Sequence, residues 1–188
     1  YTHSGLLASA AAMDKAFARR LFEQAGIPVA KGEVVKKGQT TTIPRPHVVK
    51  PLNEGSSVGV TIVTEETNDL PFTREDWPFG DRVMIERFIP GRELTVAVMG
   101  DRALGVTEIT TSRGFYDYDA KYIPGGSRHI VPAPVAPEVA AEAMRLSVLA
   151  HQVLGCRGVS RSDLRFDGES LFMLEVNTQP GMTGTSLV

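Results

Sequence analysis

The sequence contains only one cysteine, Cys156, among its 188 residues. A single cysteine excludes an internal disulfide and a cysteine-based zinc cluster, and it fits a reducing compartment, so we expect a cytoplasmic protein. There is no basic excess either, because 20 lysines and arginines face 22 aspartates and glutamates, for a net charge of −2. Nucleic acid and anionic membrane surfaces are therefore excluded as main partners. No apolar run approaches the roughly 18 residues that a membrane-spanning helix needs.

Several motifs are also missing. The sequence has no Walker A motif, which excludes a P-loop nucleotidase, and it has no internal repeat or low-complexity tract. Its four histidines are scattered without the spacing of metal ligands, so we interpret them as structural or surface residues. The chain starts at Tyr1 instead of Met and stops abruptly at Val188, which predicts a piece of a longer protein.

The hydrophobic pattern predicts an α+β fold with mainly antiparallel strands. Apolar residues at helical spacing predict a helix over 6–25, with Ser4 as a candidate cap, and a second helix over 137–154. A long loop is expected at 112–128, where Gly, Ser and aromatic residues follow no period. The predicted strands are 33–35, 47–50, 60–63, 83–88, 93–99, 103–109, 158–166 and 171–177.

The last two predicted strands carry the clearest chemical signal. Arg161 and Asp163 share one face of their strand, and Glu175 and Asn177 share one face of the next, because residues i and i+2 point the same way. The two pairs meet on one face if the numbers of opposed residues add up to an even sum, as with a three-residue loop. Asp163, Glu175 and Asn177 would then form an all-oxygen site suited to Mg²⁺, with Arg161 beside them. The alternative is a surface hairpin whose charges lie in water.

A Gly/Ser-rich stretch, residues 53–59, lies between two predicted strands and follows Lys50. Backbone amides of such a loop can close over phosphates, with the lysine supplying positive charge. An ordinary turn is the competing interpretation. Residues 55–59 also read G-x-S-x-G, but the nucleophile elbow of hydrolases requires a following helix, and the β-branched run 60–63 predicts a strand.

The aromatic and charged stretch 115–122 lies within the predicted loop. It has two interpretations that the residues alone leave open. One is a solvated loop with a few packed rings, and the other is a lid that brings Lys121 to a phosphate.

Taken together, these motifs resemble those of the ATP-grasp ligases, and within them the D-alanine–D-alanine ligase family. The resemblance implies two ATP-grasp lobes, residues 1–88 and residues 89–188, without the family's N-terminal substrate domain and final helix. It also implies a trimmed small lobe, because the stretch between Val35 and His47 is short. The matching segments, in family order, are residues 8–15, 49–60, 85–88, 93–96, 115–122, 158–163 and 174–183.

The resemblance implies a set of ligand contacts. For ATP, it implies phosphate contacts from Lys15 and Lys50, a covering loop that includes Ser57, adenine contacts from Glu86, Arg87 and Phe88, and a ribose contact from Glu93. For two Mg²⁺ ions, with Mn²⁺ as an alternative, it implies Asp163, Glu175 and Asn177. For the reacting groups, it implies Lys121 on the transferred phosphate, Tyr122 packed toward Ser56, Arg161 and the Gly181 amide at the tetrahedral intermediate, and Ser186 and Leu187 at the second D-alanine.

The implied reaction phosphorylates one D-alanine with ATP and joins it to a second, which provides a dipeptide for peptidoglycan precursors. Tyrosine at position 122 favours the dipeptide over a D-alanine–D-lactate ester. The family's tendency to dimerise makes a homodimer a candidate assembly. Two alternatives stay open: another ATP-grasp carboxylate–amine ligase, and a nucleotide-binding module without catalysis.

Overall fold

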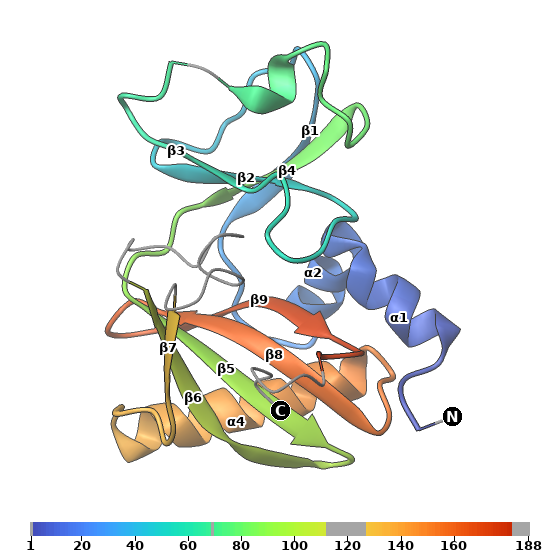
Figure 1. The fold of residues 1–188 in the computed structure, drawn as a ribbon, viewed down its shortest axis with the longest axis vertical. Helices are drawn as coiled ribbons and strands as arrows, with labels where there is room; N and C mark the ends of the chain where they lie inside the picture. Colours follow the sequence, from blue (N-terminus) through green and yellow to red (C-terminus); the bar gives the residue numbers. More distant parts are fainter. Residues whose placement is uncertain (1, 69, 112–126, 182–188) are drawn as a thin grey trace.

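The chain folds into two antiparallel sheets with helices beside them (Figure 1). A computed structural model describes residues 2–68, 70–111 and 127–181. The smaller sheet has the order β1-β4-β2-β3, and the larger has the order β7-β6-β5-β8-β9. The strands of the smaller sheet are β1 (Gly32–Lys36), β2 (His47–Pro51), β3 (Thr61–Val63) and β4 (Arg82–Arg87). Those of the larger are β5 (Arg92–Met99), β6 (Arg102–Thr111), β7 (Ser127–Ile130), β8 (Val159–Phe166) and β9 (Leu171–Asn177). The α+β prediction is confirmed.

The N-terminal helical region is two helices, α1 (Leu6–Met13) and α2 (Lys15–Gln24), and the prediction of one continuous helix is wrong. Asp14 takes an extended conformation between them, and its side chain accepts a hydrogen bond of 2.9 Å from the backbone N–H of Phe17. A carboxylate at this position satisfies a free N–H of the first turn, which is why α2 begins there.

The expected capping role of Ser4 is also wrong. Gly5 occupies the position before α1, and Ser4 is buried, with its hydroxyl hydrogen-bonded to the backbone of Arg157. The other helices in the described ranges are α4 (Pro137–Val153) and the short 3₁₀ turn η1 (Pro71–Thr73).

Two separate hydrophobic cores support the two sheets. The smaller core contains Val35, Val49, Val63 and Ile85, from the four strands of the small sheet. The larger core joins β5, β6, β8, β9 and α4, but it also contains residues of α1 and α2, such as Ala11 and Phe22. The two sheets therefore divide between β4 and β5, and α1 and α2 pack with the larger sheet.

Strand β7 lies at the edge of the larger sheet. The sequence pattern does not predict this strand, and its first two residues fall within the expected loop 112–128. It pairs with β6 from Glu108 opposite Ile130 to Thr111 opposite Ser127. Its short, polar sequence has no strand pattern of its own, so pairing with β6 defines it. Residues 112–126 lie outside the described part of the chain.

The β8–β9 hairpin has the register that the sequence argument required, but for a different reason. Asp163 opposes Glu175 and Arg161 opposes Asn177, whereas Phe166 opposes Leu171 across a four-residue turn. The register shifts between Asp163 and Leu164, which leaves an extra residue on β9. A β-bulge, and not a three-residue loop, therefore brings the four polar side chains to one face.

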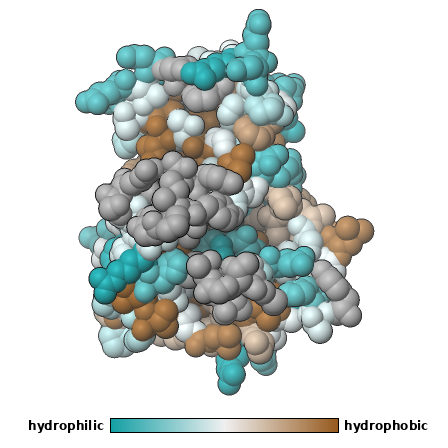
Figure 2. Space-filling view, viewed as in Figure 1, coloured by the Kyte–Doolittle hydropathy of each residue, from teal (hydrophilic) through white to brown (hydrophobic). Residues whose placement is uncertain are grey.

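Most large apolar side chains are buried, but a few project from the helices. Apolar residues gather at the edge of the molecule where α1 lies (Figure 2), and Leu6 and Leu7 of this helix are 88% and 82% exposed. No helix in the described ranges is both long and apolar enough to cross a membrane.

The larger core should dominate stability. Leu94 is fully buried on the central strand β5, so Leu94→Ala should lower the free energy of unfolding by about 2–5 kcal/mol through lost burial and a cavity. The control is Leu104→Ala on β6, where the side chain is 46% exposed. Urea unfolding followed by circular dichroism measures both, and equal losses would contradict the assigned core.

Candidate functional site

A pocket lies between the two sheets, where the chain passes from β4 into β5. All seven residues that the resemblance assigns to ATP line it, and so do Asp163 and Glu175. The seven come from α2, β2, the Gly/Ser loop, β4, the segment after β4 and the start of β5: Lys15, Lys50, Ser57, Glu86, Arg87, Phe88 and Glu93. The fold thus brings together side chains that lie up to 160 residues apart in the sequence.

One part of this pocket is apolar. Val48, Val60, Ile89 and Leu174 contribute to its lining, together with the Phe88 ring. Ligand pockets commonly combine apolar walls with a few placed polar groups, which suits a flat ring system.

Arg165 is a pocket residue that the sequence analysis missed. Its side chain is buried, donates to the Ile89 carbonyl at 3.1 Å and to Glu93 Oε2 at 3.4 Å, and lies 5.9 Å from the centre of the Phe88 ring. It therefore holds Glu93 and Phe88 in place from the facing strand. Its place in the alternation after Arg161 and Asp163 was the available signal.

The Gly/Ser loop of residues 53–59 has an unusual backbone. Ser56 and Ser57 both take positive φ angles, 52° and 59°, which non-glycine residues rarely adopt. Two turn hydrogen bonds, from Val58 N–H to Gly55 O and from Val60 N–H to Ser57 O, hold this shape. Strand β3 follows the loop, which confirms that it is not a nucleophile elbow. Left-handed residues of this kind cluster at ligand-binding turns.

Lys15 tethers this loop to α2. Its ammonium donates to the Glu54 carbonyl, and its backbone N–H donates to the Leu52 carbonyl at 3.1 Å. Burial lowers the pKa of Lys15 below its usual value and Lys50 lowers it further, although the negative charges of Glu175, Glu86 and Glu54 raise it. A cation held at a cost in a pocket is a candidate for binding an anion.

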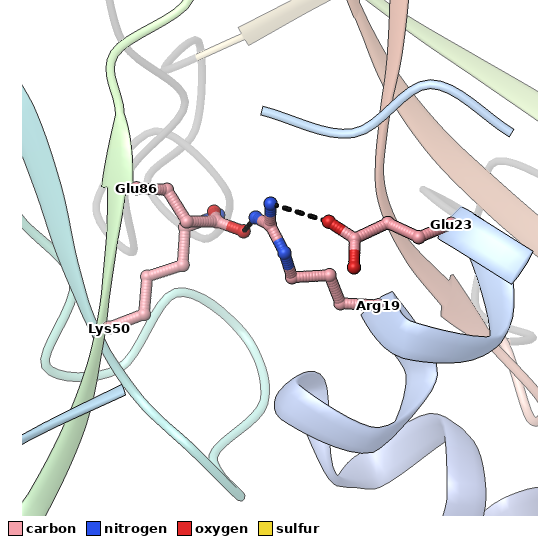
Figure 3. Close-up of polar contacts among 4 residues, drawn as sticks. All are labelled: Arg19, Glu23, Lys50 and Glu86. Carbon is pink, nitrogen blue, oxygen red and sulfur yellow. Dashed lines mark hydrogen bonds and ion pairs between the residues drawn. The ribbon is translucent and has the colours of Figure 1, made fainter. Parts of the chain in front are cut away.

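Glu86 lies at the centre of a charged cluster beside the pocket (Figure 3). Lys50 Nζ lies 2.5 Å from Glu86 Oε2, and Arg19 Nη1 lies 3.1 Å from Glu86 Oε1. The second nitrogen of Arg19 reaches Glu23 Oε1 at 2.9 Å. Both oxygens of the buried Glu86 carboxylate are therefore paired with cations.

The β8–β9 hairpin supplies one polar wall of the site, made of Asp163, Glu175 and Asn177, which we call the acidic wall. Arg161 donates to both oxygens of Asp163, at 2.9 and 2.8 Å, while Thr95 donates to Oδ1 at 2.7 Å and Asn177 to Oδ2 at 3.2 Å. These contacts confirm that Arg161, Asp163 and Asn177 share a face. Glu175 opposes Asp163 in the register, and its carboxylate makes no hydrogen bond or ion pair within the described residues.

The donor set of this wall fits a hard divalent cation. Asp163, Glu175 and Asn177 offer carboxylate and amide oxygens, which Mg²⁺ prefers, and no sulfur or imidazole. In the described ranges there is no cluster of three or more His, Cys, Asp or Glu side chains arranged for a metal. Any metal there would therefore rely on the two carboxylates, the Asn177 amide and oxygens of a bound ligand.

The remaining predicted residues fall into two groups. Ser56, Arg161 and Asn177 lie next to residues of the pocket lining, and Gly181 is exposed beyond β9. Lys121, Tyr122, Ser186 and Leu187 lie outside the described residues, as does the proposed lid stretch 115–122.

Known proteins are similar to this chain in sequence and in fold. The D-alanine–D-alanine ligase of Rhodospirillum rubrum is 73% identical over 191 residues, which cover 100% of this chain and 63% of that protein. The crystal structure of the D-alanine–D-alanine ligase from Bacillus anthracis superimposes with a TM-score of 0.84 at 28% identity, covering 100% of this chain and 63% of that one. Its complex with ATP gives 0.81 at 23% identity, covering 100% and 62%, a likeness of fold. The expected ATP-grasp architecture is confirmed.

The chain thus spans just under two thirds of the length of the relatives that it matches. Residues 20–188 match the family described as D-ala D-ala ligase C-terminus. Because this match covers most of the sequence, the chain belongs to the D-alanine–D-alanine ligase C-terminal family.

Proposed function

We propose that this chain forms the ATP-binding and catalytic part of a D-alanine–D-alanine ligase. The observation that carries the proposal is the pocket between the sheets, which combines two lysines, an apolar wall and an acidic hairpin. Phosphoryl transfer to a carboxylate needs positive charge on the phosphates and exact placement of the reactants, and little covalent chemistry from the protein.

The nucleotide would lie with its base against Phe88 and the apolar wall, near Glu86 and Arg87. Glu93, held by Arg165 at 3.4 Å, would accept a hydrogen bond from the ribose. Lys15 and Lys50 would pair with the phosphates, and the loop with Ser56 and Ser57 would cover them through its backbone N–H groups. This placement accounts for a lysine pair, a strained loop and an apolar wall in one pocket.

The acidic wall would lie at the phosphate end of the pocket. Asp163, Glu175 and Asn177 would hold two Mg²⁺ ions, or Mn²⁺, which would supply positive charge to the phosphate oxygens when bound. Arg161 adds a fixed positive charge on the same face. With the Gly181 amide, it would stabilise the negative charge of a tetrahedral intermediate.

The substrates would be ATP and two molecules of D-alanine. The first D-alanine would form an acyl phosphate with the terminal phosphoryl group of ATP, and the amine of the second would displace inorganic phosphate. Lys121 would contact the transferred phosphate, Tyr122 would pack toward Ser56, and Ser186 and Leu187 would receive the carboxylate of the second D-alanine. The dipeptide would enter peptidoglycan precursors.

The cellular setting follows from the same role. A ligase that consumes ATP, with one cysteine in its sequence, fits the cytoplasm. We infer a homodimer from the family resemblance, and sedimentation of the chain would test it.

The proposal is tested in two steps. First, calorimetry should show that the chain binds ATP in the presence of Mg²⁺. Second, a chimera in which this chain replaces the aligned segment of the Rhodospirillum rubrum ligase should release phosphate with D-alanine. Phosphate release with L-amino acids alone would indicate another ATP-grasp ligase. Nucleotide binding with no turnover in the chimera would indicate a binding module.

A further inference from the structure

Arg19 is a partly buried cation beside the pocket that no ligand role accounts for. It lies on α2, one turn after Lys15, and only 12% of its side chain is exposed. It contacts Glu86 on β4 and Glu23 on its own helix (Figure 3). Because α2 packs in the larger core and β4 belongs to the smaller sheet, Arg19 links the two parts of the molecule at the pocket.

Gly32 on β1 leaves the space that this contact occupies. It pairs directly with Glu86, and a Cβ atom at Gly32 would lie 2.7 Å from the Ile85 carbonyl oxygen, 2.8 Å from Glu86 Cγ and 2.9 Å from Arg19 Nη1. Any other residue there would press on both side chains. The missing side chain at Gly32 thus leaves room both for the Ile85 carbonyl and for the contact between Arg19 and Glu86.

Glu86 shares its charge between Arg19 and Lys50 in this structure. The proposed function, on which this inference rests, assigns Lys50 to the phosphates of ATP. Glu86 would then be a carboxylate 10% exposed with one cation fewer, and an unpaired buried charge is strongly disfavoured. A second cation that stays on Glu86 removes this conflict.

We propose that Arg19 is a positioning residue that holds Glu86 at the nucleotide base and leaves Lys50 available to the phosphates. Its planar guanidinium contacts Glu86 with one nitrogen and Glu23 with the other, so its direction is fixed from α2. Arginine keeps its charge in a buried pair more readily than lysine does. Arg19 itself would not contact ATP.

The test measures the affinity of the chain for ATP by calorimetry in Mg²⁺ buffer. Arg19→Gln should weaken ATP binding by about tenfold, since a hydrogen-bonded buried charge pair is lost. It should also reduce the preference for ATP over GTP, because Glu86 would no longer be held at the base. Arg19→Lys should recover part of the affinity, and Arg20→Gln, at an exposed neighbouring position, should match the wild type.

A double-mutant cycle separates positioning from a general effect on folding. In a Glu86→Gln background, Arg19→Gln should cause little further loss of ATP affinity, because its partner charge is gone. Melting temperatures of all variants identify any that are unfolded. A folded Arg19→Gln variant with wild-type affinity and ATP/GTP preference would overturn the inference alone. Failure of the wild-type chain to bind ATP would instead overturn the proposed function.

Discussion

Glu175→Gln should abolish most of the Mg²⁺-dependent turnover of the ligase chimera while leaving the fold intact. The substitution keeps the size of the side chain and removes only its charge. We expect a loss of about 100-fold or more in kcat, since metal-binding and charge-stabilising groups contribute on that scale. Phosphate release with D-alanine, measured over a range of Mg²⁺ concentrations, gives the result.

The structure explains why stability should change little. The Glu175 carboxylate makes no hydrogen bond or ion pair among the described residues, and its described electrostatic partner is Lys15, whose pKa its charge raises. Gln at this position leaves Lys15 its hydrogen bond to the Glu54 carbonyl, so the cost to folding stays small. Asp163, by contrast, accepts hydrogen bonds from Arg161, Thr95 and Asn177, and its replacement would disturb all three. Glu175 is therefore the cleaner test of the acidic wall.

The matched control is Glu169→Gln, which removes the same charge from an exposed position in the turn of the same hairpin. It should keep full activity. A folded Glu175→Gln variant with activity close to that of the control would contradict the role of the hairpin in metal binding.

The hairpin also shows how far sequence reasoning can go. Alternation along each strand is local, so the pairs Arg161 with Asp163 and Glu175 with Asn177 followed from the sequence. The register between the strands depends on the β-bulge after Asp163, which no local pattern indicated. The prediction that the two pairs share one face is therefore correct, and the three-residue loop offered as its reason is wrong.

The N-terminal region shows the opposite case. The apolar period continues across residues 6–25, so the sequence pattern favours one helix, but Asp14 interrupts it and caps α2. That break places Lys15 at the first turn of a new helix, where it reaches the Gly/Ser loop. Contacts that depend on packing between distant elements, such as Arg19 with Glu86 or Arg165 with Glu93, leave too weak a local signal to predict.

Lys15→Met should weaken ATP binding without lowering the stability of the fold. Lys15 is proposed to pair with a phosphate, so its loss should weaken ATP binding by about 10- to 100-fold. The same substitution removes a cation that the folded chain holds at a cost, because burial is the main cause of its lowered pKa. The melting temperature at pH 7 should therefore stay equal to that of the wild type or rise.

The stability and the ATP affinity of the wild type should also respond in opposite directions to a rise in pH. Because the pKa of Lys15 is lower in the folded chain than the usual value of 10.5, the unfolded chain binds more protons between the two values. In that alkaline window the contribution of Lys15 to the free energy of unfolding rises with pH, whereas ATP affinity falls as the ammonium loses its proton. Lys15→Met should remove both contributions.

The exposed Lys36 provides the control, since Lys36→Met removes a charge of the same kind from a residue that does not line the pocket. Calorimetric ATP titrations and thermal melts between pH 7 and pH 10 compare the three proteins. A Lys15→Met variant that melts lower than wild type but binds ATP equally well would show that Lys15 supports the loop through Glu54 and takes no part in phosphate binding. The predicted pattern, weaker binding with undiminished stability, would mean that the fold keeps this buried cation for its ligand, because a residue retained for packing has no reason to carry a charge that burial opposes.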